Sequence, residues 1–334
     1  MGSGLVASPE SARLAALGLL VAGIMSVTNV FMEVARKKAV TGVALLPATF
    51  WCHIFDTLVF AAAWFWRHGA DPRPLIHGAD PRGYALCLTL DLILLGFANW
   101  LFFKALQESA MSRAVPFLAF TSVFLVPTGF LILRELPPLA KLLGVVLTVV
   151  GSLLMERRAF ADGWLAPFRA VYREKGSRYM LGVALLVALS TPLDKKLSLM
   201  TDIYTQSLIY GAGMSVFFYA LCRTRGEPLR AGVTQGWGWI ALAGTLDALS
   251  LLLQFAAYRH VGVVLVIAIK RSGIVLSVLF GWWFFHERHI REKLLAAGVM
   301  FIGVLMLYVN FSTLCAVEIV VGTLACAGIA ARWL

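Results

Sequence analysis

Two adjacent cations, Lys270 and Arg271, lie well inside the apolar stretch VVLVIAIKRSGIVLSVLFGWWFF, residues 263–285. A Lys or Arg at the centre of a membrane span costs about 2.5–3.5 kcal/mol on insertion scales. If the span begins at Val261, Lys270 lies about 13 Å along the helix, close to the midplane of the bilayer and beyond comfortable snorkelling. Both side chains must therefore meet acids, carbonyl groups, water or an anionic ligand inside the protein.

This pair of side chains has the chemistry of an anion clamp. Arg offers a planar fork and Lys a point charge, a combination suited to phosphate or carboxylate. The alternative is a structural salt bridge to acids on other apolar runs. The candidate counter-ions are Asp91, Asp247, Glu33 and Asp194. Charges inside membrane spans are more often functional than structural, so we expect an anion site.

Asp91 and Asp247 lie some seven to ten residues into their apolar runs, so we expect both to be deep. One interpretation is proton coupling, because burial and a nearby cation act in opposite directions on the protonation of a carboxyl group. The other is that these acids neutralise the two cations and help the helices pack. The predicted cavity residues on the same two runs are Asn99, Trp100, Gln254 and Tyr258.

Glu33 and Asp194 lie near the ends of their runs, beside clusters of cations. Glu33 and Lys37 have the i,i+4 spacing of an ordinary surface pair on a helix, which favours a structural role. Asp194 follows Pro192, which can break a helix and expose backbone groups to a cavity. We therefore expect these two acids to serve charge pairing or coupling.

The elements that carry these residues are those of a membrane protein. Of the 334 residues, 60% are hydrophobic and only 14% are charged. The mean hydropathy is +0.82, whereas a soluble domain is about half apolar and a quarter charged. The net charge of +11 comes from cations in short gaps between apolar runs, as the positive-inside bias predicts. This distribution excludes nucleic acid as a partner.

Ten apolar runs approach the roughly 20 residues that a membrane-spanning helix needs. We place them at 14–35, 44–66, 84–107, 114–133, 139–156, 179–197, 203–222, 237–258, 261–285 and 293–309. An eleventh run, 312–334, is either an extra span or a tail lying on the surface. The sequence therefore predicts an all-α polytopic membrane protein of ten transmembrane helices, with a possible eleventh hydrophobic helix at the C-terminus.

The two sets of five runs repeat one another. The tripeptide Thr-Leu-Asp ends at Asp91 and again at Asp247, 156 residues later. Further matches in the same order pair Asn29 with Ser190, Glu33 with Asp194, and Glu135 with Glu287. An odd number of spans per repeat places the second copy in the opposite direction, and inverted repeats with a shared midplane site are typical of secondary transporters.

Two five-span halves, each closed by an LxxRE or FFHE turn and a Gly-bearing helix, resemble the EamA-type branch of the drug/metabolite transporter superfamily. The resemblance implies repeats at 14–156 and 179–310, a polar linker at 157–178 and an extra segment at 311–334. It also implies a secondary transporter in the bacterial inner membrane that works by alternating access. Together with the cations Lys270 and Arg271, this leads us to expect a small anionic or zwitterionic metabolite as substrate.

The phosphate-translocator branch of that superfamily carries a Lys-Arg pair in the same late span. The likeness implies that Lys270 and Arg271 contact the anionic group of the substrate. This sequence departs from that branch because VIAIKRSG lacks some polar residues that usually precede the pair. The first repeat has the apolar residues Leu118 and Ala119 at the corresponding place, so the predicted site is asymmetric.

Other functions remain open on the sequence. A flippase for lipid-linked sugars or lipid head groups would share the fold, and a non-transporting receptor is disfavoured by the buried charges. A membrane enzyme would need a nucleophile–base pair or metal ligands, and the sequence presents neither. The histidines are loop-side or isolated and the five cysteines form no CxxC pair. We therefore expect no enzymatic activity, cofactor or metal; a homodimer is compatible with this interpretation.

Overall fold

The protein is all-helical wherever its structure, a computed structural model, describes it. The described residues are 9–41, 43–69, 81–121, 123–125, 127, 139–154, 172–230, 233–258, 263–286, 290–308 and 313–333, without the side chains of some of them. No strand occurs in these ranges. Most of the predicted linker, 157–178, lies outside them, as do the side chains of Tyr258 and Arg271. The prediction of an all-α protein is confirmed.

The helices follow the predicted apolar runs. In the first half they are α1 (Pro9–Ala39), α2 (Leu45–His68), α3 (Pro81–Glu108), α4 (Met111–Ala114), the 3₁₀ helix η1 (Val115–Ala119) and α6 (Leu139–Leu154). In the second half they are α8 (Lys175–Met200), α9 (Ile203–Arg225), α10 (Val233–Tyr258), α11 (Val263–Phe285) and α12 (Ile290–Tyr308). A last helix, α13, covers Thr313–Trp333.

The described helices have the length and the surface that a bilayer requires. Within the described residues, four stretches are long and apolar enough to cross a membrane: Leu45–His68, Arg82–Glu108, Lys175–Asp194 and Gly236–Ala257. Large apolar side chains such as Leu20, Ile24 and Trp283 are exposed on the outside of the bundle. Such an outer surface is stable in hydrocarbon and would be an aggregation liability in water.

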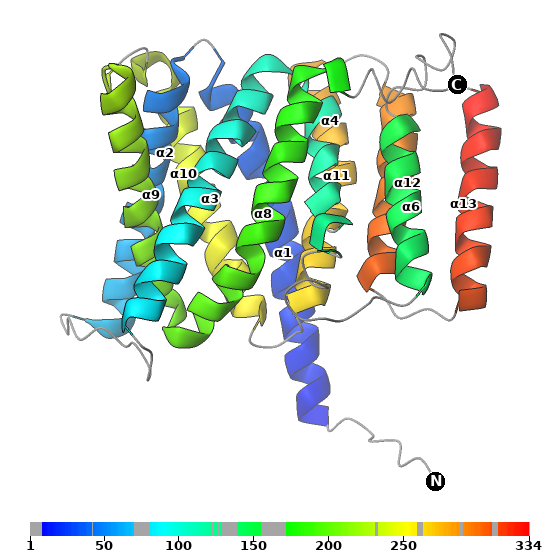
Figure 1. The fold of residues 1–334 in the computed structure, drawn as a ribbon, viewed down its shortest axis with the longest axis horizontal. Helices are drawn as coiled ribbons and strands as arrows, with labels where there is room; N and C mark the ends of the chain where they lie inside the picture. The colour runs from blue at the N-terminus through cyan, green and yellow to red at the C-terminus, as the bar shows by residue number, and fades with distance from the viewer. Residues whose placement is uncertain are drawn as a thin grey trace.

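The two halves are inverted copies of each other. In Figure 1, α1 runs upward from the N-terminus, whereas α8, its counterpart in the second half, runs downward. Helix α1 packs on α10, and α3 packs on α8. Because α1 corresponds to α8 and α3 corresponds to α10, these two contacts are equivalent in the two halves. The pairs α2 with α9 and α6 with α12 join equivalent helices. The predicted inverted five-helix repeats are confirmed.

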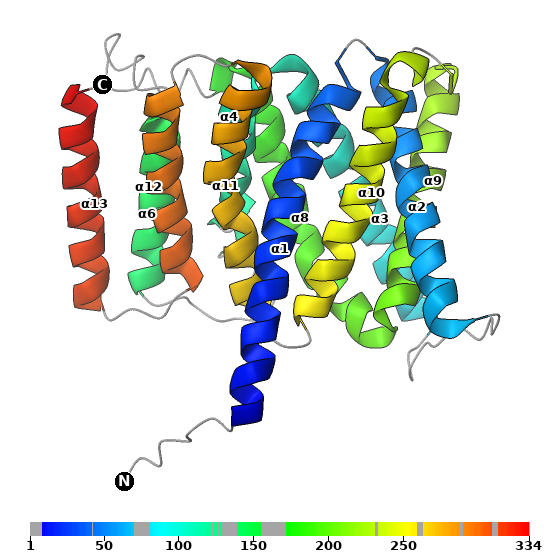
Figure 2. The same cartoon turned by 180° about the vertical axis from the view of Figure 1, so that it is seen from behind.

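The C-terminal hydrophobic run is a further long helix of the bundle, not a tail along its surface. Helix α13 stands at the outer edge, alongside α6 and α12 (Figures 1 and 2). Its residue Ala327 packs with Leu147 of α6 and with Val299 and Met306 of α12. This contact buries one face of α13 and leaves residues such as Val321 exposed.

The fourth predicted span does not begin as one regular helix, which corrects the prediction of a continuous run at 114–133. Helix α4 ends at Ala114 and passes into η1, which contains Pro116 near its start. Proline has no N–H to donate and its ring clashes with the carbonyl four residues earlier, so it disfavours a continuous α-helix. The 3₁₀ turn includes Leu118, the counterpart of Lys270 in the unbroken α11.

Candidate functional site

A cavity of about 150 Å³ lies between the two halves. Its walls come from α1, α3 and η1 of the first half and from α8, α9, α10 and α11 of the second. The polar residues that line it are Asn29, Glu33, Arg36, Asn99, Tyr210, Asp247 and Lys270. Apolar side chains, among them Phe102 and Leu118, complete the wall. Two cations and two acids therefore face one small space.

An ion pair between Arg36 and Asp247 joins the halves at this cavity. The Nη2 atom of Arg36 lies 2.5 Å from Oδ2 of Asp247, and the two side chains are 6% and 22% exposed. The guanidinium of Arg36 also lies 5.2 Å and 4.8 Å from the ring centroids of Phe102 and Phe103. Removing either partner of such a buried pair would strongly destabilise the fold, because the other charge would stay buried without compensation.

Lys270 reaches the cavity from α11 and is held there by Gln254 of α10. Its Nζ donates a hydrogen bond of 2.8 Å to Oε1 of Gln254. The structure thus brings together two residues predicted to bind substrate. The predictions for Arg271 and Tyr258 concern side chains outside the described part of the chain.

Glu33 is a buried residue of α1, which corrects its interpretation as one half of a surface pair. Its side chain is 3% exposed and accepts hydrogen bonds from Nδ2 of Asn29, at 3.0 Å, and from Oγ of Ser277. Lys37 donates to the carbonyl oxygens of Leu106 and Ser109, where α3 ends. The helix runs on to Ala39, which is why Glu33 lies deeper than expected.

Asp91 and Asp194 form a second polar region, between α3 and α8. Asp91 is fully buried, and its carboxyl group faces Ser190 and Asp194 of α8. Asp194 in turn lies close enough to Lys270 of α11 for the two charges to attract each other. Helix α8 continues through Pro192 to Met200, so Pro192 does not break the helix beside Asp194.

The remaining predicted pair, Asn99 and Trp100, separates in space. Asn99 lines the cavity and donates a 3.0 Å hydrogen bond to the carbonyl of Leu95. Trp100 packs instead with the cluster around Phe50 and Phe218. Its ring lies 5.1 Å from Nζ of Lys104.

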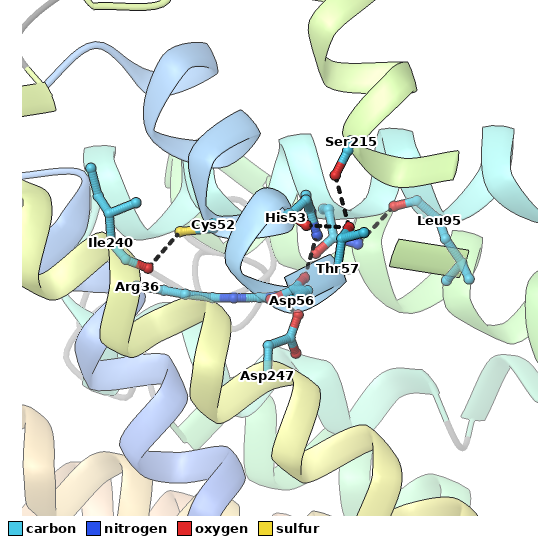
Figure 3. A network of polar contacts seen from close by, with 10 residues as sticks. Arg36, Cys52, His53, Asp56, Thr57, Leu95, Ser215, Ile240 and Asp247 are labelled. Atoms are coloured by element: carbon cyan, nitrogen blue, oxygen red, sulfur yellow. Dashed lines mark hydrogen bonds and ion pairs between the residues drawn. The ribbon is translucent and has the colours of Figure 1, made fainter. Parts of the chain in front are cut away.

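Sequence reasoning missed a buried polar cluster on α2. His53 was expected to be loop-side or isolated, yet it is fully buried, and its Nδ1 lies 2.6 Å from Oδ2 of Asp56 (Figure 3). Arg36 and Tyr210 were not predicted to line the cavity either. The signal for the α2 cluster was visible, because a His and an Asp three residues apart in the apolar run 44–66 fall on one helix face.

Three of these side chains offer ligand atoms to a cation. One atom each from His53, Asp56 and Asp247 lie within 4.8 Å of one another. The guanidinium of Arg36 already contacts Asp247, so a metal ion would have to approach against that fixed positive charge. The donor set therefore fits a metal ion poorly.

Comparisons with known proteins agree with the observed fold. The sequence profile of the EamA-like transporter family matches residues 13–157 and 174–309. One solved crystal structure superposes with a TM-score of 0.60 at 14% identity, covering 89% of this chain and 98% of the other, which shows a shared fold. No curated protein matches the chain by sequence.

Proposed function

This chain belongs to the EamA-like transporter family and is a multi-pass membrane transporter; we propose that it carries a small anionic or zwitterionic metabolite by alternating access. The two inverted halves would open the shared site to one side of the membrane and then to the other, as in other inverted-repeat transporters. We propose the bacterial inner membrane as its location.

The observation that carries this proposal is the composition of the cavity wall. Lys270 and Arg36 bring two positive charges, and Glu33 and Asp247 bring two negative charges, to a space of about 150 Å³. A zwitterion would meet complementary charges in such a space, and an anion would compete for one cation. An uncharged apolar substrate would form no favourable electrostatic contact with any of these four charges.

Each predicted site residue has a role in this proposal. Lys270 and Arg271 hold the anionic group of the substrate, and Gln254 orients Lys270 through its 2.8 Å hydrogen bond. Asp91 and Asp247 carry the coupling charge. Asn99 and Tyr258 are the other proposed cavity residues, and Glu33 and Asp194 are the charge-pairing residues. Trp100, which packs with the cluster around Phe50 and Phe218 and not on the cavity wall, has a packing role.

Transport by purified protein in vesicles tests the assignment. A thermal-shift screen with phosphorylated metabolites and amino acids would first select a ligand, and uptake of that ligand would then be compared between variants. Lys270→Ala and Arg271→Ala should each abolish uptake while protein yield is retained. The matched control is Lys196→Ala, since Lys196 is an exposed cation of α8.

Two results would count against the proposal. Normal uptake by both Lys270→Ala and Arg271→Ala would remove the site assignment. Movement of a lipid-linked substrate, with no uptake of soluble metabolites, would favour a flippase of the same fold.

A further inference from the structure

A cluster of four ionisable side chains lies beside the cavity, between α1, α2 and α10 (Figure 3). His53 and Asp56 are 0% and 1% exposed and share a 2.6 Å hydrogen bond. Asp247 and Arg36 complete the cluster through their ion pair. Both members of that ion pair also line the cavity, whereas His53 and Asp56 do not. The cluster is thus a buried extension of the site already described.

A close approach of two helices at Gly244 creates this arrangement. A Cβ atom at Gly244 of α10 would collide with the carbonyl of Cys52 and would lie 3.1 Å from Oδ1 of Asp56. Only glycine lets α10 come this near to α2, and Asp247 follows one helical turn later. The same Oδ1 atom and Nε2 of His53 are buried without a hydrogen-bond partner in the part of the chain that is described.

The charges of this cluster do not cancel. From the helices packed around Asp56, the ionisable groups are Arg36 of α1, Tyr210 of α9, Asp247 of α10 and Cys52 and His53 of α2. Asn99 of the neighbouring α3 does not titrate. With both aspartates ionised, Arg36 alone leaves one negative charge over. An uncompensated buried charge is strongly unfavourable, so one further positive charge is needed.

We propose that the His53–Asp56 pair is a proton-binding site that supplies this charge at neutral pH. The proton is held on the carboxyl group of Asp56, either on Oδ2 beside His53 Nδ1 or on Oδ1, which has no partner among the described residues, and the ion pair of Arg36 with Asp247 sets whether it stays. If an anionic group in the cavity takes Arg36 away from Asp247, the acids lose their compensating cation and take up one more proton. This coupling step rests on the proposed transport function; the proton site itself does not.

A proton suits this site better than a metal ion. Sodium, magnesium and calcium require several oxygen ligands, whereas this cluster offers two carboxylates and one nitrogen. A divalent ion would overshoot the single missing charge and would have to displace Arg36 from Asp247. A proton needs neither more ligands nor more space.

Infrared difference spectroscopy of the ligand-free, purified full chain tests the proposal. The wild type should show the C=O band of a protonated buried carboxyl group at neutral pH. Asp56→Asn should remove that band. Asp247→Asn should also remove it at neutral pH, because Arg36 then neutralises Asp56 without a proton. Asp202→Asn, which alters an acid at a helix end, should leave it unchanged.

Three results would overturn the proton site, and one would assign it to a metal ion. Persistence of every acid band in Asp56→Asn, or of the Asp56 band in Asp247→Asn, would overturn the proposal. If Asp56→Asn does not fold, His53→Gln provides the second variant, and an unshifted Asp56 band in it would overturn the proposal as well. A thermal shift with sodium or zinc chloride that Asp56→Asn abolishes would assign the site to a metal ion instead. Since no substrate is used, failure here leaves the uptake test of Lys270→Ala unaffected.

Discussion

The interface of α1 with α10 and the interface of α3 with α8 are equivalent in the inverted fold, yet they bury an aspartate in different surroundings. Asp247 of α10 lies 2.5 Å from the guanidinium of Arg36. Asp91 of α3 faces Ser190 and Asp194 of α8 and forms no ion pair with a cation among the described residues. The residue 161 positions after Arg36, the offset that relates α1 to α8, is the fully buried Leu197.

This difference shows which features the repeat preserves and which it does not. The backbone packing is kept, since exchanging the halves exchanges the two interfaces. The electrostatics are not kept, because a cation stands in one interface and a leucine in the other. A second pair of equivalent positions also differs in charge, because Lys270 of α11 corresponds to the apolar Leu118 of η1. In the proposed alternating-access mechanism, the two halves would open the site to either side of the membrane in turn, and one set of charges would serve both states.

The largest effect is expected from Arg36→Leu, which gives the α1/α10 interface the residue found at Leu197. Asp247 and Asp56 would then be buried without a cation, and breaking a buried pair from one side costs about 3–5 kcal/mol. Thermal unfolding in detergent would measure the loss. The double variant Arg36→Leu with Asp247→Asn should recover most of it. Wild-type stability of the single variant would show that the two interfaces are electrostatically alike.

The next effect is expected from Gly244→Ala, which acts on the close packing of α10 against α2, beside the α1/α10 interface. The new methyl group would meet the carbonyl of Cys52 and Cβ of Phe55, and overpacking of this kind costs about 1–3 kcal/mol. The position 156 residues earlier, on α3, is Leu88, so the close approach has no counterpart.

Gly238→Ala is the matched control for that variant. Gly238 lies on the same helix with nothing within 4 Å of an added Cβ. Alanine there should stabilise the helix by up to about 1 kcal/mol, because glycine is the weaker helix former. Equal melting temperatures for the two variants would contradict the close approach.

A smaller loss of stability is expected from Asp202→Ala. Asp202 is an acid at the start of α9, so it can be compared with the acids buried inside the bundle. It caps α9, accepting from the backbone N–H groups of Tyr204 and Thr205, and lies 3.2 Å from Nε2 of His68. Partial burial alone would raise the pKa of Asp202, but the hydrogen bonds from Thr205 and His68 outweigh it and lower that pKa below its usual value.

The pH dependence of this cap follows from that direction. A carboxyl group with a lowered pKa stabilises the fold fully above its ordinary pKa, about 4, and loses the effect as the pH falls through the lower folded value. Asp202→Ala should therefore cost about 1 kcal/mol at neutral pH and nothing in strong acid. A difference in melting temperature that grows on acidification would contradict the capping role.

Helix positions could be predicted from the sequence, whereas the partners of the buried charges could not. The length of an apolar run and its recurrence are local properties, so the spans and the inverted repeat were found. Arg36 lies in Arg36-Lys37-Lys38, a group with the composition of a loop. Its pairing with Asp247, 211 residues away, depends on how α1 packs against α10.

Depth along a helix was also underestimated where cations lie near its end. Glu33 was placed at the surface because Lys37 follows it by one turn, but Lys37 bonds to the last carbonyl groups of α3 and lets α1 continue inside the protein. Asp56 gave the opposite error. It shares the apolar run 44–66 with His53, but its place beside Arg36 and Asp247 depends on the close approach of α10 at Gly244.

The smallest effect is expected from Asp91→Asn, and it decides how the α3/α8 interface differs from the other. If Asp91 is uncharged because no cation stands at Leu197, the amide replaces a neutral group of the same shape, and the stability should change by less than about 0.5 kcal/mol. Thermal unfolding at neutral pH measures this, with uptake by the same variant as the functional readout. A loss as large as that of Arg36→Leu would mean that Asp91 is ionised and that both interfaces hold compensated charges.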